Sequence, residues 1–441
     1  MENKKISSKE LYERAKKVLT GGISRNTIFR EPHPNYVQTA QGSYITDIDG
    51  HTRVDFANNM ASLIHGHSNQ EIINAVTKQL CKGTAYTMGS IAEVKFAELL
   101  TTRNNNYEKI RFMNSGTEAV MTMIKASRAF NGKSKIAKAE GTYHGTYDYA
   151  EISQISNPKN WGPIENPNSN PVVSGTPHNI LNDVIIFPFN DTKRTIDILE
   201  RNKNDITCVL LDLVPHRVGL MPIKDDYLTA IYNWTRKNNS LLVFDEVVTY
   251  RANYSGAQQN FSIVPDLTAM GKIIGGGFPI GALAGKSEVM EVLNPRNQPL
   301  KHPHSGTFSA NPISTTAGYV AMKLFDKKTV EELNLITGKA IKQIEEAIAI
   351  ADIPACITGM GSMFRIHLKE TKPTNFRETY QDKKTLDIIK HLLDFLYHEK
   401  NIIMINTLSC MFATTIHQKE IDILSEGLLD GFKKIKPLIE K

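Results

Sequence analysis

The chain has 441 residues, of which 41% are hydrophobic and 22% charged, as is typical of a globular protein large enough for two domains. Its net charge of +6 is small for this length and comes from basic residues scattered among acidic ones, so we expect no nucleic-acid partner. Four separated cysteines form no CxxC pair and no apolar stretch reaches membrane-spanning length, so we predict a cytoplasmic protein without disulfides, a metal site or a membrane span.

The N-terminal residues predict a short helix followed by a small antiparallel sheet. Residues 8–19 have the apolar spacing of an amphipathic helix, and two glycines follow it. Residues 36–40 and 43–56 alternate apolar and polar side chains, which indicates a β-meander. We assign residues 1–60 to a smaller domain.

From about residue 68, apolar strands alternate with amphipathic helices, which indicates βαβ units. Several strands are continuous apolar runs, as expected in a parallel sheet that is buried on both faces. The predicted strands are residues 109–114, 135–140, 183–189, 207–214 and 240–247, and the predicted helices between them are 117–131, 194–202 and 225–238. We assign residues 61–310 to the large domain, in which the polar stretch 151–180 is a long loop.

Residues 311–441 are predicted to complete the smaller domain together with the N-terminal meander. The expected helices are 311–325, 327–351, 382–399 and 418–437, and the expected strands are 361–368 and 402–406. The polar segment 369–381 is predicted as a loop.

Two residues of the large domain point to a specific chemistry. Asp245 ends the apolar run in LLVFDEV, and Lys272 precedes the glycine-rich segment GGGFPIG. A lysine can form a Schiff base with the aldehyde of pyridoxal 5′-phosphate (PLP), and an aspartate can keep the pyridine nitrogen protonated. A strand-end aspartate and a surface lysine also occur in many α/β proteins without a cofactor, so this interpretation needs support from other motifs.

Three further motifs offer that support, each with a simpler alternative. In RFMNSGTEAV, the hydroxyls of Ser115 and Thr117 and the following helix start could bind a phosphate, or Ser115 could be an ordinary N-cap. In KAEGTYHGTYD, Tyr143 beside His144 could stack on a flat ring or fill a turn. In HSGTFSANP, Thr307 could bind phosphate or begin a helix.

The order of the motifs NSGTEA, GTYHG, FDEV, GKIIGGGFPIGA and GTFSANP resembles that of the class III aminotransferases, which are PLP enzymes of fold type I. The chain is most similar to the branch with glutamate-1-semialdehyde aminomutase and the β-phenylalanine-type aminotransferases. The resemblance implies an α/β fold in which helices flank a mostly parallel seven-stranded sheet. It also implies a smaller α+β domain built from both termini.

The resemblance assigns roles around the cofactor ring to five residues. Lys272 would be the Schiff-base lysine and the proton shuttle, and Asp245 would pair with the pyridinium nitrogen. Val247 would pack on one face of the ring and Tyr143 on the other, with His144 beside it.

The cofactor phosphate would be held by two subunits. The resemblance places Ser115, Gly116 and Thr117 on the phosphate of their own subunit and Thr307 on that of the neighbouring one. The active protein would therefore be a homodimer with shared active sites.

The chain departs from the family where the substrate would bind. Asp212 begins Asp-Leu-Val where the family has Glu-Pro-Val, and His216 and Arg217 replace small residues, so they could enter the site or lie in an ordinary loop. Ser409 aligns with a glutamate of the aminomutases.

Arg25, in GGISR, is the first candidate for the substrate carboxylate, and a surface arginine is the alternative. Arg365 is the second candidate, pointing either inward or outward. Asn58, Asn59 and Met60 align with a pocket-lining stretch.

We therefore expect an aminotransferase that moves an amino group between a carboxylated amine and a keto acid by a ping-pong mechanism. The amine could be a β-amino acid or a β-keto acyl intermediate, either free or tethered to a carrier protein. The alternatives are a glutamate-1-semialdehyde-type 2,1-aminomutase and a PLP-dependent racemase or epimerase.

Overall fold

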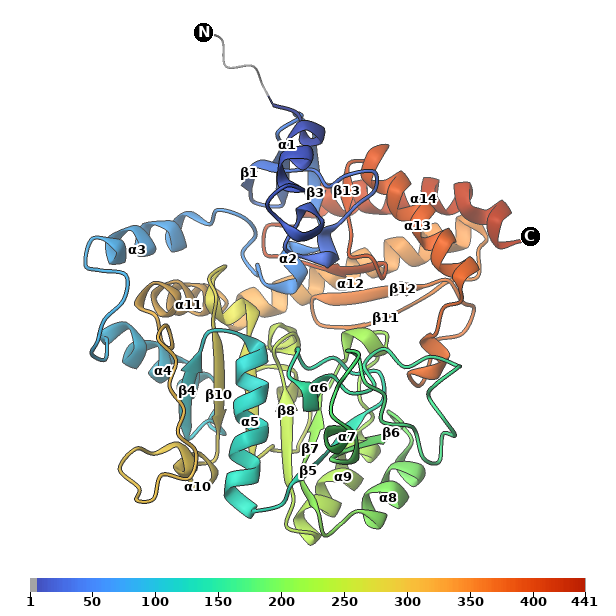
Figure 1. Ribbon diagram of the computed structural model, residues 1–441. Helices are drawn as coiled ribbons and strands as arrows, with labels where there is room; N and C mark the ends of the chain where they lie inside the picture. The colour runs from blue at the N-terminus through green and yellow to red at the C-terminus, as the bar shows by residue number, and fades with distance from the viewer. Residues whose placement is uncertain (1–5, 441) are drawn as a thin grey trace.

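A seven-stranded sheet forms the centre of the larger part of the molecule in the computed structural model, which describes residues 6–440 (Figure 1). The strand order is β4-β10-β9-β8-β7-β5-β6. The strands are β4 (Lys109–Met113), β5 (Lys135–Ala139), β6 (Val184–Phe187), β7 (Ile206–Leu211), β8 (Leu241–Asp245), β9 (Leu267–Gly271) and β10 (Gly281–Gly285). All pairs are parallel except those of β10, which confirms the predicted α/β class.

The strands β9 and β10 are missing from the sequence-based prediction because they contain few β-branched or aromatic residues. Close backbone contacts explain the composition of β10. A Cβ on Gly281 would lie 2.0 Å from the carbonyl oxygen of Ser115, and one on Gly285 would lie 2.2 Å from that of Asp266. Both positions therefore require glycine, although glycine weakens the strand pattern.

All five predicted strands of the large sheet end one to three residues earlier than expected, and the same local structure ends two of them. The Asp212 carboxylate accepts a hydrogen bond from the Val214 N–H at 2.9 Å, directly after β7. The Asp245 carboxylate accepts one from the Val247 N–H at 3.0 Å, at the end of β8. Such Asx turns lead the chain out of the sheet at its carboxyl edge.

Helices cover both faces of this sheet. The predicted helices agree within two residues with α5 (Gly116–Asn131), α8 (Thr192–Arg201) and α9 (Asp225–Lys237), and α5 crosses the front of the sheet in Figure 1. Further helices are α3 (Gln70–Leu80), α4 (Ile91–Arg103), α10 (Ser287–Met290) and α11 (Pro312–Leu324), and α11 packs against α3 and α4. The predicted long loop is shorter, since α6 (Asp148–Glu151) and α7 (His178–Asn182) enclose it.

The smaller α+β part combines both ends of the chain. One sheet has the order β1-β2-β3-β13 and the other β11-β12-β14, and β13 pairs in parallel with β3. The strands are β1 (Val37–Gln41), β2 (Tyr44–Asp47), β3 (Thr52–Asp55), β11 (Cys356–Met360), β12 (Met363–His367), β13 (Ile402–Ile403) and β14 (Ser409–Met411). The helices are α1 (Ser8–Ala15), α2 (Asn58–Ala61), α12 (Lys327–Ala351), α13 (Lys383–His398) and α14 (Gln418–Ile439).

Three predictions in this part need correction. The first helix ends at Ala15 rather than at residue 19, the strand 402–406 shortens to two residues, and α14 runs on to Ile439. The expected division of the chain at residues 60 and 310 stays a prediction.

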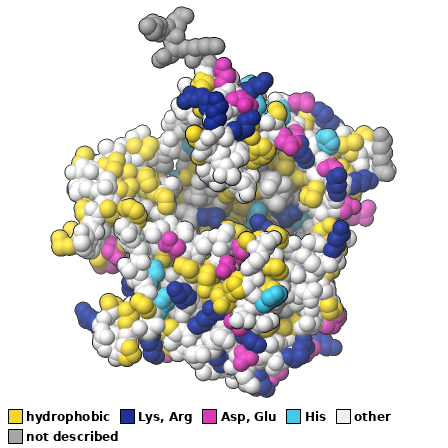
Figure 2. Space-filling model, in the orientation of Figure 1, with side chains coloured by type: hydrophobic (Ala, Val, Ile, Leu, Met, Phe, Trp, Pro, Cys, Tyr) yellow, Lys and Arg dark blue, Asp and Glu magenta, His cyan; other side chains and the backbone are white. Residues whose placement is uncertain are grey.

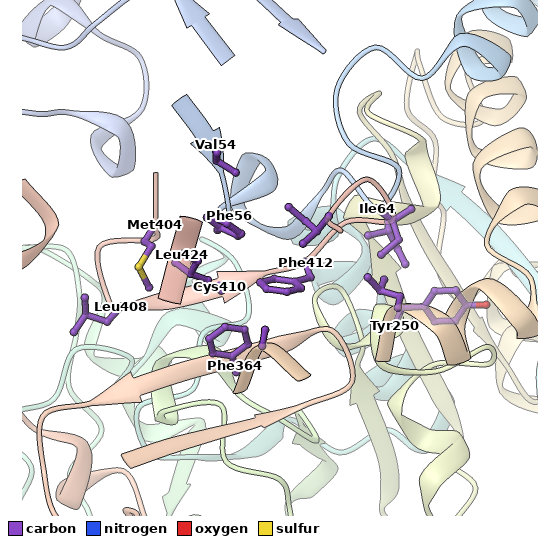
Figure 3. Close-up of a cluster of buried hydrophobic side chains, with 14 of the residues drawn as sticks. Val54, Phe56, Ile64, Tyr250, Phe364, Met404, Leu408, Cys410, Phe412 and Leu424 are labelled. Carbon is purple, nitrogen blue, oxygen red and sulfur yellow. The ribbon is translucent and has the colours of Figure 1, made fainter. Parts of the chain in front are cut away.

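One apolar core joins the N-terminal and C-terminal segments (Figure 3). The ring of Phe412 lies 5.6 Å from that of Phe56 and 5.5 Å from that of Phe364, and all three side chains are fully buried. Val54 and Leu424 belong to the same cluster. This shared core fixes the position of β12.

Within residues 6–440, no helix is long and apolar enough to cross a membrane. The same residues contain no group of three His, Cys, Asp or Glu side chains that could hold a metal ion.

Candidate active site

The predicted cofactor residues other than Thr307 lie at or near the carboxyl edge of the large sheet, where ligands bind in open α/β folds. Asp245 is the last residue of β8, and Lys272 directly follows the neighbouring parallel strand β9. Figure 2 shows a hollow between the larger and the smaller part of the molecule, with Lys or Arg and His side chains visible at its base. The strand ends therefore face a cleft that a small molecule can enter.

A buried histidine orients the Asp245 carboxylate. His144 Nδ1 lies 2.7 Å from Asp245 Oδ2, and His144 Nε2 lies 3.0 Å from the Thr142 hydroxyl. Burial lowers the pKa of His144, and the hydrogen bond with Asp245 opposes this shift. We therefore assign a neutral imidazole that donates its Nδ1–H to the carboxylate. With the Val247 N–H, two donors hold Asp245 in one orientation.

Lys272 combines an unusual backbone with a perturbed amine. Its φ of 49° lies in the left-handed region, a conformation that costs energy for a residue other than glycine and is concentrated at functional sites. Burial lowers the pKa of Lys272, while the nearby carboxylates of Asp245 and Asp212 oppose the shift. A lowered pKa increases the share of neutral amine, which is the nucleophilic form.

The N-terminus of α5 has the predicted cap and also the shape of an anion site. Ser115 is an N-cap, because its hydroxyl accepts a hydrogen bond from the Glu118 N–H at 3.1 Å. The N–H groups of the first helical turn, which includes Gly116 and Thr117, have no acceptor within the helix. A Cβ on Gly116 would lie only 2.6 Å from Val247 Cγ1, so glycine lets the segment after β8 approach α5 here.

Tyr143 lies between two glycines after β5, as predicted. Its side chain is 39% exposed, and the Arg217 guanidinium lies over its ring at 5.1 Å from the centroid. Burial raises the pKa of Tyr143, and Arg217 opposes this shift. Because this ring is not packed into the core, it can stack on a flat molecule, which favours the first of the two sequence interpretations.

Arg25 is held by the smaller part of the molecule. Its Nη1 donates a hydrogen bond to Asn59 Oδ1 at 2.6 Å. Asn59 belongs to α2, where residues 58–61 have φ angles of 44°, 48°, 55° and 71°, a left-handed turn without glycine. Arg25 is exposed, and no contact joins it to Lys272 within the described residues.

Thr307 lies on the surface, and within residues 6–440 no hydrogen bond joins it to Ser115, Gly116 or Thr117. It is exposed in a segment that lines a shallow hollow with Tyr86 and Met88. A Cβ on the preceding Gly306 would lie 3.3 Å from Asn114 Nδ2, so the segment passes near the start of α5. The structure thus brings together all predicted cofactor residues except Thr307, which the resemblance assigned to the neighbouring subunit.

Two features of the site go beyond the sequence interpretation. Burial raises the pKa of Asp212 well above its usual value, and the nearby charge of Asp245 adds to this shift. Arg377, from the predicted loop 369–381, donates to the Glu140 carboxylate at 2.9 Å. This pair ties the loop to the end of β5, a long-range contact without a local sequence signal.

Comparisons with known proteins agree with this geometry. The family model Aminotransferase class-III matches residues 28–428. A glutamate-1-semialdehyde 2,1-aminomutase of Methanococcus maripaludis is 34% identical over 417 residues, which cover 94% of each chain. An ω-transaminase structure from Sphaerobacter thermophilus is 38% identical with a TM-score of 0.94 and 97% of each chain covered. A β-phenylalanine aminotransferase from Variovorax paradoxus is 27% identical with a TM-score of 0.87, covering 98% of this chain and 95% of that one. The resemblance noted in the sequence is confirmed.

Proposed function

Because this chain belongs to the class III aminotransferase family, we propose that it moves an amino group between a carboxylated amine and a keto acid. The cofactor is pyridoxal 5′-phosphate. When bound, the cofactor supplies an electron sink for the electrons that remain at the substrate carbon after a proton leaves. The residues at the carboxyl edge of the sheet fit this group: an amine with a lowered pKa, an oriented carboxylate and a helix N-terminus with free N–H groups.

In this proposal, Lys272 has two successive tasks. Its amine would hold the cofactor covalently and, once freed by the substrate amine, would be available as a base. The freed amine is a base with a lowered pKa, and it carries a proton away from the substrate carbon and returns it at the other end of the reacting system. In the second half-reaction the same amine moves the proton in the opposite direction on the keto acid.

The remaining cofactor residues bind and orient. Asp245 keeps the ring nitrogen protonated, and His144 holds the Asp245 carboxylate in place through the 2.7 Å hydrogen bond. Val247 and Tyr143 would pack on the two faces of the ring. Ser115, Gly116 and Thr117, at the first turn of α5, would hold the phosphate, and Arg25 would bind the substrate carboxylate.

The observation that carries aminotransfer over isomerisation is the environment of Ser409. This buried residue lies on β14, and its hydroxyl is 2.9 Å from that of Thr407. The family resemblance aligns it with a glutamate of the aminomutases, so in our proposal this wall offers hydroxyl groups instead of a carboxylate. The 38% identity with an ω-transaminase supports the same conclusion.

The aminomutase reaction is the second candidate, because the Methanococcus relative with that name is 34% identical over nearly the whole chain. The two functions differ in their need for a second substrate. An aminotransferase with a β-amino acid should stop after the first half-reaction, seen as a change in cofactor absorbance, and resume only when a keto acid is added. Sustained isomerisation of glutamate-1-semialdehyde without a keto acid would establish the aminomutase instead.

We also propose a homodimer whose subunits share the active sites. The side chains of Tyr86, Met88, Ile91 and Phe308 are 45%, 83%, 76% and 59% exposed, an unusual amount of apolar surface for one face. Tyr86, Met88 and Ile91 line a groove beside α4. Figure 2 shows hydrophobic side chains gathered over this side of the molecule. Burial of this face against a second copy would also bring Thr307 to the partner.

A further inference from the structure

We propose that Arg365 binds a carboxylate group of the substrate from the small-domain side of the cleft. This inference rests on the proposed aminotransferase function and adds a second anion-binding residue to Arg25. It assigns a specificity-determining role to the side chain of Arg365, whose direction, inward or outward, the sequence did not decide.

The alternation of side chains along β12 settles the direction of Arg365. Phe364 and Ile366 point into the core shared with α12 and α14. Met363 packs in the core cluster of the large sheet, and His367 Nε2 lies 3.2 Å from the carbonyl oxygen of Gly219. Since alternate residues of a strand share a face, Arg365 points with Met363 and His367 toward the large domain.

The neighbouring strands place Arg365 opposite the segment that follows β7. In the sheet, Arg365 is flanked by Thr358 on β11 and Ser409 on β14. The Thr358 hydroxyl donates to the carbonyl oxygen of Gly219 at 2.5 Å. On the other side, Ser409 is linked through Thr407 to His216, whose Nε2 lies 3.3 Å from the Thr407 hydroxyl. Arg365 therefore faces the turn that carries His216 and Arg217.

The Arg365 guanidinium is buried without a partner. Only 4% of the residue is exposed, yet Nε has no hydrogen-bond acceptor and no carboxylate of residues 6–440 forms an ion pair with it. Burial lowers the pKa of Arg365 to about 10, so the group stays charged at neutral pH. An unpaired buried charge destabilises a fold, which indicates that it has a ligand.

Three other buried arginines, which have structural roles, form hydrogen bonds or ion pairs within the protein. The guanidinium of Arg53 pairs with Asp47, that of Arg103 donates to three carbonyl oxygens, and that of Arg251 donates to a hydroxyl and two carbonyls. Each of them has acceptors within the protein itself. Arg365 differs in this respect, although it is as well buried.

The surroundings of His216 connect Arg365 with the reacting end of the site. Burial, followed by the charges of Arg365, Lys272 and Arg217, lowers the pKa of His216 to about 3. His216 is therefore neutral and lies among three cations, one of which is the proposed Schiff-base lysine. An anionic group that enters here meets the planar guanidinium of Arg365, which suits a carboxylate bound through two parallel hydrogen bonds.

The test uses the holoenzyme and two unreactive probes, 3-phenylpropionate and its amide, because neither has an amine or a keto group. Binding is measured by titration calorimetry for the wild type, Arg365→Gln, Arg365→Lys and the control Arg194→Gln. Arg194 lies on α8 and is 42% exposed, so its substitution removes a charge from the surface. We expect Arg365→Gln to weaken carboxylate binding at least tenfold, Arg365→Lys to retain part of it, and amide binding and the control to stay unchanged.

Thermal denaturation separates this role from a structural one. Removal of an unpaired buried charge should leave the melting temperature of Arg365→Gln equal to or above that of the wild type. Unchanged carboxylate binding, or an equal loss for acid and amide together with a lower melting temperature, would overturn the proposal. If the wild type binds the carboxylate through Arg365 but transfers no amino group, the proposed function fails while this inference stands.

Discussion

Replacement of Asp245 by asparagine isolates one charge at the site. The side chain keeps its size, and the oxygen of the new amide can still accept the hydrogen bond that the Val247 N–H now donates at 3.0 Å. His144 can exchange its tautomer and use Nε2–H toward Thr142, which lies at 3.0 Å. We therefore expect the fold to lose only about 1 kcal/mol, the difference between a charge-assisted and a neutral hydrogen bond.

The effect on catalysis should be much larger. Asp245 is 5% exposed, and opposite charges in contact near a protein surface attract by about 4 kcal/mol. If that attraction keeps the cofactor nitrogen protonated, its loss should slow proton removal from the substrate by about a thousandfold. Single half-reactions, followed by cofactor absorbance with the melting temperature as a control, measure both effects. A half-reaction rate within tenfold of the wild type would refute the assigned role of Asp245.

Three further predictions test the surroundings of the site. Because the pKa of Asp212 is raised in the fold, the unfolded chain loses this proton at a lower pH than the folded protein does. The stability of Asp212→Asn relative to the wild type should therefore rise between about pH 4 and neutral pH. A melting temperature of the variant that falls relative to the wild type over this range would contradict this prediction. Gly116→Ala should cost about 1–3 kcal/mol in unfolding experiments, and Val247→Ala in the same chain should recover part of it, because the new Cβ meets Val247 at 2.6 Å. Met88→Asp should shift sedimentation toward the monomer, whereas Val18→Asp, at an equally exposed position, should not.

The sequence predicted the layer architecture because its evidence is local. Continuous apolar runs identify β7 and β8, and a serine before an amphipathic segment identifies the start of α5. The sequence-based prediction failed for β10. Its glycines are required by close packing against Ser115 and Asp266, and no local pattern reveals these contacts. Strand ends were also misplaced, because side chains of Asp212 and Asp245 turn the backbone away while the apolar run continues.

For the candidate site too, the sequence revealed the local motifs but not the contacts between distant segments. Motifs with fixed local spacing identified Lys272, Asp245 and the residues of the α5 turn, and the fold brings them together. The hydrogen bond between His144 and Asp245 and the ion pair of Glu140 with Arg377 join segments that are distant in sequence, so no local pattern announces them. Such contacts depend on how strands and loops meet in space.

The sequence of β12 contained one signal for the proposed role of Arg365. In the run MFRIH, Arg365 and His367 alternate with Phe364 and Ile366, a pattern of one apolar and one polar face. Such a strand commonly turns its polar face to water, but here that face meets the large domain across the cleft. In our proposals, β12 contributes Arg365 and the large sheet contributes Lys272, so the choice of substrate and the chemistry would come from different parts of the chain. A substitution on β12 can therefore change which carboxylate is accepted and leave the machinery that moves the proton in place.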